Sequence, residues 1–277
     1  MNRLLEAKCL DLARELAQSY SDLAPPFSLQ PLIEHFGIER VRERPLDRDA
    51  CLRAESGRLF IDVNSMYPLV RRRLSIAHEI GHLIVKECSP EELWGNADPA
   101  TEALCNRLAG TLLAPELALR RYFESASTLS DWQDPIRCST VVAAASAFGI
   151  SVDAMAARVF HELGLAPGIV AIIWRFMENA LRPGSEKAIR IASVWHKCCD
   201  RTYIPRNKTL PADSLIARAF RRSGVVSGIE QLSLGTLRGK FRLEALGFGL
   251  GLGFEREGGF GAALSLAYPA LVSSAYN

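Results

Sequence analysis

The stretch SIAHEIGHLIV, residues 75–85, decides how this sequence is interpreted, because it combines an apolar helical stripe with the pattern H-E-x-x-H. On a helix, His78 and His82 lie on one face about one turn apart, so both imidazoles can reach one ion. Glu79 projects about 100° round the axis from His78, which puts its carboxylate beside that ion rather than on it. The pattern predicts a catalytic zinc site in which Glu79 is the general base.

The alternative is a core helix that carries two histidines without a metal. Ile76, Ile80 and Leu83 form the apolar stripe that would anchor the helix in either case. Gly81 leaves room for another element to come close. Because a catalytic zinc needs three protein ligands and one open position, a third ligand downstream would favour the metal site.

Glu102 is the best candidate for this third ligand. Glu87 shares the histidine helix but lies a full turn beyond His82. Asp98 is a good N-cap before a proline, so a second helix is predicted over residues 99–114. A short loop lets this helix run antiparallel to the first, with Glu102 in its first turns. We therefore expect zinc, with manganese as the alternative metal, on His78, His82 and Glu102.

The remaining pattern up to residue 165 predicts a mostly helical α+β domain. A turn at Ser56-Gly57 between alternating apolar residues indicates a hairpin over residues 51–64. Further helices are predicted over the first twenty residues, from Ser28 to His35 and from Pro115 onward, with a short strand at Ile38–Val41.

Residues 139–163 have the outline of a helix-turn-helix, with Ser151 capping the second helix. The outer face is expected to carry Ser146, Asp153 and Arg158 rather than a basic cluster. Phosphate contacts require Lys and Arg, so this pattern favours packing over DNA binding.

Residues 163–168, LGLAPG, are the predicted joint between a domain of residues 1–165 and a second one of residues 168–277. The first part, up to residue 167, holds 18 Lys and Arg against 23 Asp and Glu (−5), and the rest holds 15 against 8 (+7). The second part is rich in strands, with a predicted hairpin turn at Arg238-Gly239 and a strand with one bare face over residues 247–254. Its basic character suits an acidic partner. The alternative is a solvated surface with a modest charge bias and no such partner.

The composition also limits the location of the protein. No apolar run reaches the roughly 18 residues that span a bilayer, and the N-terminal residues lack the pattern of a signal peptide. The seven cysteines are scattered and never spaced as C-x-x-C, which argues against a disulfide framework. We expect a cytoplasmic protein without membrane partners. The sequence contains no pattern that indicates whether the protein is a monomer or an oligomer.

The segment RRRLSIAHEIGHLIV (71–85) followed by TEALCNRLAGTLLAPE (101–116) resembles the ImmA/IrrE-type metallopeptidases. Their signature is A-H-E-x-G-H on one helix and E-x-x-x-N-x-x-A-x-x-L-L-x-P on the next. The sequence from Glu102 to Asn106 most resembles the IrrE radiation-response branch. The sequence departs at Leu108, where an aromatic residue is usual, and at Ala114, where methionine is common. The other positions of the second motif are matched by Ala109, Leu112, Leu113 and Pro115.

The resemblance implies a zincin-like endopeptidase that cleaves a helix-turn-helix repressor in a stress-response or mobile-element switch. It also implies a GAF-like domain for residues 168–277, on the length of that part alone. Two rivals stay open. One is a non-hydrolytic, zinc-stabilised regulator that binds a partner or DNA through its basic second domain, and the other is a broad-specificity peptidase. Tyr67, Tyr122 and Arg73 are unranked candidates for stabilising the oxyanion.

Overall fold

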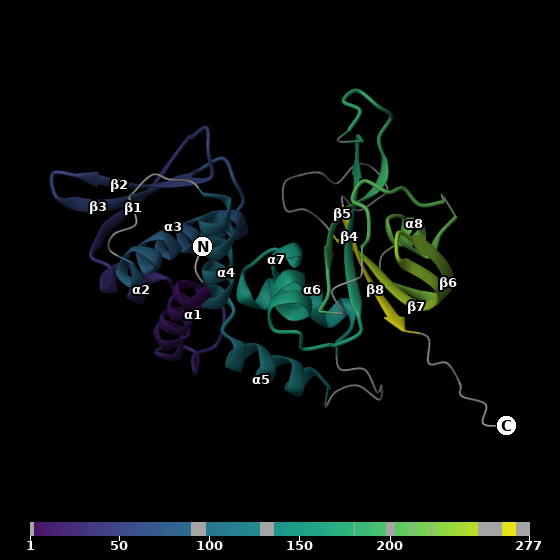
Figure 1. Ribbon diagram of the computed structural model, residues 1–277, viewed down its shortest axis with the longest axis horizontal. Helices are drawn as coiled ribbons and strands as arrows, with labels where there is room; N and C mark the ends of the chain where they lie inside the picture. Colours follow the sequence, from purple (N-terminus) through teal and green to yellow (C-terminus); the bar gives the residue numbers. More distant parts are fainter. Residues whose placement is uncertain are drawn as a thin grey trace. The chain divides into compact units, whose positions relative to one another are not determined.

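The computed structural model describes residues 3–89, 98–127, 136–179, 181–197, 203–211, 213–222, 224–248 and 262–269. The chain divides into two compact units (Figure 1). The first unit comprises residues 1–128 and 144–155, and the second comprises residues 129–143 and 156–277. The predicted boundary at residues 165–168 stays a prediction.

A three-stranded sheet forms one layer of the first unit. Its order is β1-β3-β2, so β2 is an edge strand. β1 runs parallel to β3, and β2 pairs with β3 antiparallel. Ser56 and Gly57 both have positive φ angles (51° and 77°), as the predicted two-residue hairpin turn requires. The strands are β1 (Ile38–Arg44), β2 (Ala50–Glu55) and β3 (Arg58–Asn64).

Helices pack against this sheet in the first unit. The side chain of Asp98 accepts from the backbone N–H groups of Ala100 and Thr101, so the predicted N-cap of the second site helix is confirmed. Ile80 is fully buried, as the predicted apolar stripe requires, whereas Ile76 is only half-buried. The helices are α1 (Arg3–Gln18), α2 (Gln30–His35), α3 (Leu69–Cys88), α4 (Pro99–Leu113) and α5 (Glu116–Ser127).

The predicted helix-turn-helix segment consists of α6 (Cys138–Phe148), α7 (Val152–Ala156) and a π-helical turn η1 (Ala157–Glu162). Ser151 caps the second helix, because its Oγ accepts from the N–H of Ala154. The expected outward position of Arg158 is wrong. Arg158 is only 4% exposed, and its guanidinium pairs with Glu162 at 2.8 Å. A buried arginine held by an ion pair one turn away is part of the packing of this segment.

A five-stranded antiparallel sheet organises the second unit, in the order β5-β4-β8-β7-β6. The predicted turn at Arg238-Gly239 is wrong, since Leu234 pairs with Leu237 and the turn is Gly235-Thr236. Gly235 has a φ of 64°, and a Cβ there would meet the carbonyl oxygen of Tyr203 at 2.2 Å, so only glycine fits. The strands are β4 (Val170–Met177), β5 (Ala188–Trp195), β6 (Val225–Leu234), β7 (Leu237–Phe248) and β8 (Ala262–Pro269).

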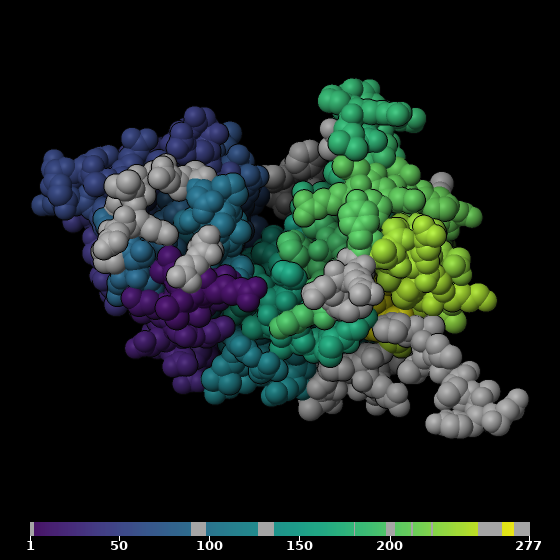
Figure 2. Space-filling view, in the orientation of Figure 1, coloured from purple at the N-terminus to yellow at the C-terminus, as the bar shows by residue number. Residues whose placement is uncertain are grey.

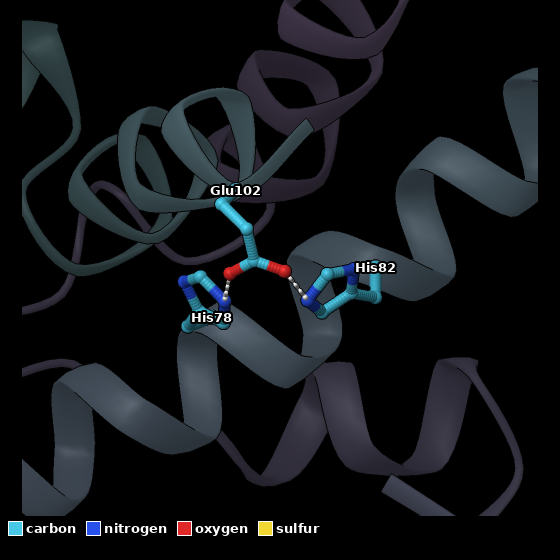
Figure 3. A group of neighbouring side chains, drawn as sticks. All are labelled: His78, His82 and Glu102. Carbon is cyan, nitrogen blue, oxygen red and sulfur yellow. Dashed lines mark hydrogen bonds and ion pairs between the residues drawn. The ribbon is translucent and has the colours of Figure 1, made fainter. Parts of the chain in front are cut away.

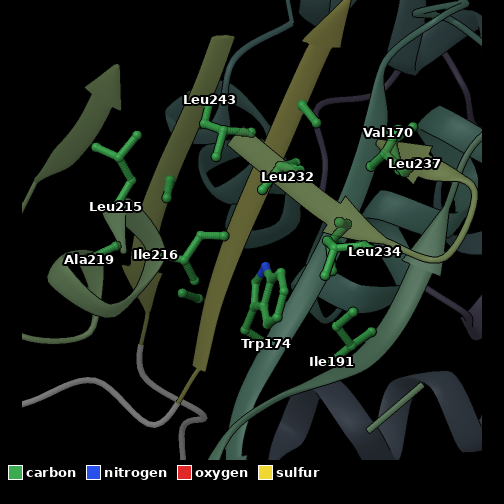
Figure 4. Close-up of a cluster of buried hydrophobic side chains, with 14 of the residues drawn as sticks. Val170, Trp174, Ile191, Leu215, Ile216, Ala219, Leu232, Leu234, Leu237 and Leu243 are labelled. Carbon is green, nitrogen blue, oxygen red and sulfur yellow. The ribbon is translucent and has the colours of Figure 1, made fainter. Parts of the chain in front are cut away.

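One face of this sheet forms an apolar core with the short helix α8 (Leu215–Ala219), which the sequence did not predict (Figure 4). Trp174 lies at the centre of this core and donates from its indole N–H to Ser265 Oγ at 2.8 Å. The predicted strand over residues 247–254 is described only as far as Phe248, where β7 ends; residues 249–261 lie outside the described ranges. The connection between β4 and β5 projects at the top of Figures 1 and 2, and Leu181 within it is 83% exposed.

The predicted fold class is confirmed, with helices and a small sheet in the first unit and a larger sheet in the second. Within the described ranges, no single helix is long and apolar enough to cross a membrane. The segments Cys138–Phe148 and Val152–Glu162 reach that length and composition only together, and they are bent by 114° at the break between them.

Candidate metal centre

The candidate site is formed by α3 and α4, which lie close together because of Gly81. A Cβ at Gly81 would approach the Cα and carbonyl oxygen of Cys105 at 3.2 Å each. The glycine thus lets the α4 backbone approach the face of α3 that carries His78 and His82. The sequence suggested this role for Gly81, and the structure confirms the close approach.

Three side chains converge between these helices (Figure 3). Glu102 points down from α4 between the two imidazole rings of α3, with Oε2 3.0 Å from His78 Nε2 and Oε1 3.5 Å from His82 Nε2. One donor atom from each residue lies within 4.8 Å of the others. Zinc bonds of roughly 2 Å in a tetrahedron hold donor atoms about 3.3 Å apart, so these separations suit one ion.

Hydrogen bonds to the outer ring nitrogens set the orientation of both histidines. Nδ1 of His78 lies 3.0 Å from Asn106 Oδ1, and Nδ1 of His82 lies 3.4 Å from Cys105 Sγ. With the Nδ1–H of His78 donating to Asn106, a neutral ring presents the lone pair of Nε2 to the carboxylate of Glu102. Two acceptors facing each other at 3.0 Å repel unless a cation lies between them. The donor set therefore fits a metal ion.

Burial supports the neutral form of the His82 imidazole. Desolvation lowers the pKa of His82, and the neighbouring His78 lowers it further, against the opposing effect of Glu102. A lowered pKa keeps the ring deprotonated at neutral pH, which is the form that binds a metal.

Glu79 lies beside this group rather than within it. Its Oε2 accepts a hydrogen bond of 2.9 Å from the backbone N–H of Leu52 on the edge strand β2. Burial raises the pKa of the Glu79 carboxyl, while its interaction with the neighbouring His78 and the Leu52 hydrogen bond act in the opposite direction. A raised pKa makes the carboxylate a better proton acceptor near neutral pH.

The three oxyanion candidates are engaged in other contacts. Arg73 donates to the carbonyl oxygen of Phe27 at 2.8 Å, and Tyr122 packs edge-on against Phe148. The guanidinium of Arg71 lies over the ring of Tyr67 at 3.8 Å. These contacts give no support to an oxyanion role for any of the three.

Two features of the site were not assigned from the sequence. Asn106 was noted as part of the second motif, but its hydrogen bond to His78 was not predicted. Its position four residues after Glu102, on the same helical face, is the signal that could have indicated it. The contact between Leu52 and Glu79 joins residues 27 apart through a backbone N–H, and no side-chain pattern signals such a contact.

Residues 32–160 match the model of a peptidase family described as "IrrE N-terminal-like domain". This match confirms the resemblance to ImmA/IrrE-type proteins for that part of the chain, which includes the whole candidate site. No curated protein sequence matches the chain. Among solved structures, the chain is similar to a Mycobacterium tuberculosis transcriptional regulator, with a TM-score of 0.56 and 16% identity over 94% of this chain and 87% of that one. At this identity the similarity shows the fold alone.

Proposed function

We propose that this protein is a zinc-dependent endopeptidase that makes a site-specific cut in a protein substrate. The observation that carries the proposal is the convergence of His78, His82 and Glu102 on one point with Glu79 beside them. The first three would hold the ion and leave one position open. When bound, zinc supplies Lewis-acid chemistry, polarising a carbonyl and lowering the pKa of water.

Glu79 would move the protons of the reaction. Its Oε2 is held by Leu52, so the carboxylate stays fixed against the edge strand while it takes a proton from the attacking water. It would then pass the proton to the leaving amine. A purely structural metal site has no use for a half-buried carboxylate beside the ligands, so the position of Glu79 favours hydrolysis over a scaffold role.

The edge strand β2 fits an extended peptide substrate. The N–H of Leu52 points off the sheet to Glu79, and backbone groups of alternate residues on a strand face the same way. The backbone groups of Ala50 and Ala54 therefore face the same open edge. A substrate segment paired with this edge would pass next to the carboxylate, and main-chain pairing requires an unfolded or extended stretch of the substrate.

The resemblance of this chain to the ImmA/IrrE-type metallopeptidases suggests a helix-turn-helix transcriptional repressor as the substrate. Cleavage of the repressor would switch stress-response or mobile-element genes. The alternative is a non-hydrolytic regulator that acts through its basic C-terminal part. The fold shared with a protein described as a transcriptional regulator suits both. A protease that regulates one repressor should leave unfolded casein uncut, whereas a broad-specificity peptidase would digest it.

Glu79→Gln tests the proposal. The purified protein is incubated with helix-turn-helix proteins encoded beside its gene, and cleavage is followed by mass spectrometry. We expect one zinc per chain in both forms, and a loss of cleavage of about 10²–10⁴-fold in Glu79→Gln, the usual contribution of a general base. Glu87→Gln, an exposed acid on the same helix, is the matched control and should cut normally.

Cleavage by Glu79→Gln at the normal rate would remove the mechanism. Salt-dependent DNA binding by the intact protein, with no cleavage of any helix-turn-helix protein tested, would favour the non-hydrolytic regulator.

A further inference from the structure

A cavity of about 270 Å³ lies in the second unit, on the sheet face opposite the α8 core. Successive side chains on β7 alternate between the two faces, so Leu243 points into the core drawn in Figure 4 while Arg242 and Glu244 point to the cavity. The side chains that line it most directly are Arg137, Ser227, Ile229, Arg242, Glu244 and Tyr268. None of them contributes to the candidate metal centre.

The buried carboxylate of Glu244 is already satisfied by protein donors. Its Oε1 accepts from the backbone N–H of Cys138 at 3.2 Å, and its Oε2 accepts from Arg137 Nε at 3.3 Å. The hydroxyl of Tyr268 shares its one proton between Glu244 Oε2 at 3.3 Å and the carbonyl oxygen of Ile136 at 3.1 Å. Glu244 is 5% exposed. A carboxylate with two N–H donors, one of them charged, and a share of a hydroxyl proton does not require a cation from solution. It therefore acts as an internal anchor for Arg137.

The charges at the cavity leave a positive excess. Arg137 and Arg242 contribute two positive charges and Glu244 one negative charge, giving +1. The guanidinium of Arg242 lies over the ring of Tyr268, 4.2 Å from its centroid, which holds it at the cavity wall. Two guanidinium groups fixed beside a cavity with low-dielectric walls favour an anion, and their planar forks suit the two oxygens of a carboxylate or phosphate.

The other walls are apolar or hydroxylic. Ile229 is 75% exposed, which is unusual for a large aliphatic side chain on a strand, and Ser227 lies two residues before it on the same face of β6. A Cβ added at Gly228 would meet the side chain of Leu215 on α8, on the other face of the sheet. Gly228 therefore contributes only backbone to the cavity. This wall fits a flat or aliphatic body attached to the anionic group.

We propose that this cavity binds a small organic anion, with a carboxylate or phosphate held by Arg137 and Arg242 and an apolar body against Ile229 and the ring of Tyr268. The volume lies just below the usual range of small-molecule sites, roughly 300–1,000 Å³, which restricts the ligand to a compact molecule. The site rests on the cavity and its charges and does not depend on whether the protein is a peptidase.

Binding of benzoate and phenyl phosphate to the full-length protein tests this site, with benzyl alcohol and benzylamine as neutral and cationic counterparts of similar shape. Saturation-transfer NMR and calorimetry measure the affinities. We expect at least one of the two anions to bind, benzyl alcohol to bind at least about tenfold more weakly, and benzylamine not to bind. A preference for phenyl phosphate over benzoate, or the reverse, identifies the anionic group. Absence of binding by both anions, or equal binding of the alcohol, would overturn the proposal.

Two variants locate the binding. Arg242→Gln removes one guanidinium from an exposed position and should weaken binding of the anions about tenfold. Arg238→Gln, another exposed arginine on β7 that does not line the cavity, is the matched control and should bind normally. Ser227→Leu should abolish binding by filling the cavity without altering its charge. Unchanged affinity in both Arg242→Gln and Ser227→Leu would place the anions elsewhere.

Discussion

Two glutamates stand at the centre of a polar cluster, one in each unit, and their partners differ in kind. Glu102 has a side chain that is 39% exposed, and its oxygens face the Nε2 atoms of His78 and His82. Glu244 has a side chain that is only 6% exposed, and its oxygens face N–H and O–H donors. In the first cluster, lone pairs of nitrogen and oxygen atoms converge on one point. In the second, the carboxylate oxygens accept hydrogen bonds from protein donors.

This difference separates a metal site from a cluster in which the carboxylate itself needs no ligand. Convergent acceptors destabilise one another until a cation is bound, so the Glu102 cluster makes chemical sense as a metal centre. Matched donors around a buried carboxylate lower the free energy of the folded state without any ligand. Removing the Glu102 carboxylate should therefore change metal binding, whereas removing the Glu244 carboxylate should change the free energy of unfolding.

Glu102→Ala should give the largest effect on metal binding. Loss of a supporting partner outside the ligand shell typically costs about 10–100-fold in metal affinity, and loss of a ligand should exceed that. We expect purified Glu102→Ala to contain no stoichiometric zinc, measured by mass spectrometry of the metal. Its circular dichroism without metal should match that of the metal-free parent. Unchanged zinc affinity would identify Glu102 as the wrong acid.

Glu244→Ala should give the reverse result. It removes the acceptor from Arg137, Tyr268 and the N–H of Cys138, so the free energy of unfolding should fall by about 3 kcal/mol. Urea unfolding measures this loss, and the zinc content should stay at one per chain. Glu186→Ala, an exposed acid in the same unit, is the control and should unfold like the parent. A stable Glu244→Ala variant would contradict the structural role of this cluster.

Asn106→Ala sharpens the comparison, because Asn106 supports the metal cluster without belonging to it. Removing the acceptor from Nδ1 of His78 frees the ring to rotate or to change tautomer. Zinc affinity should fall by about 10–100-fold in competition titrations with a chelator, while stability of the metal-free protein stays the same because Asn106 is exposed. Asn106→Asp, which keeps an acceptor, should retain most of the affinity.

The two clusters also differ in how well the sequence predicts them. His78, Glu79, His82 and Glu102 lie within 25 residues on two helices, so helical periodicity and one antiparallel turn were enough to bring them together. The contacts of Glu244 to Arg137 and Cys138 span 107 and 106 residues and depend on how a long chain folds back onto a sheet. No local pattern encodes such a contact.

Local patterns failed in the second unit for the same reason. The turn between β6 and β7 was expected at Arg238-Gly239, but the same stretch has a second glycine, Gly235, three residues earlier. The position is decided by Tyr203, whose carbonyl oxygen accepts from the N–H of Thr236 at 2.9 Å and leaves no room for a side chain at residue 235. Residue 203 is more than thirty positions away, so propensity alone cannot select between the two glycines.

Tyr268→Phe should give the smallest effect and is the finest test of the comparison. The hydroxyl of Tyr268 lies 3.1 Å from the carbonyl oxygen of Ile136 and 3.3 Å from Glu244 Oε2, so its one proton is shared between two acceptors. Its removal leaves Glu244 with the N–H donors of Arg137 and Cys138. A net loss of about 0.5–1.5 kcal/mol in the free energy of unfolding is expected. If Tyr268 stabilises the fold through its hydrogen bond to Glu244, Tyr268→Phe and Glu244→Ala remove the same interaction. Their losses in the free energy of unfolding should then not add in the double variant. Additive losses would show that Tyr268 acts through Ile136 alone.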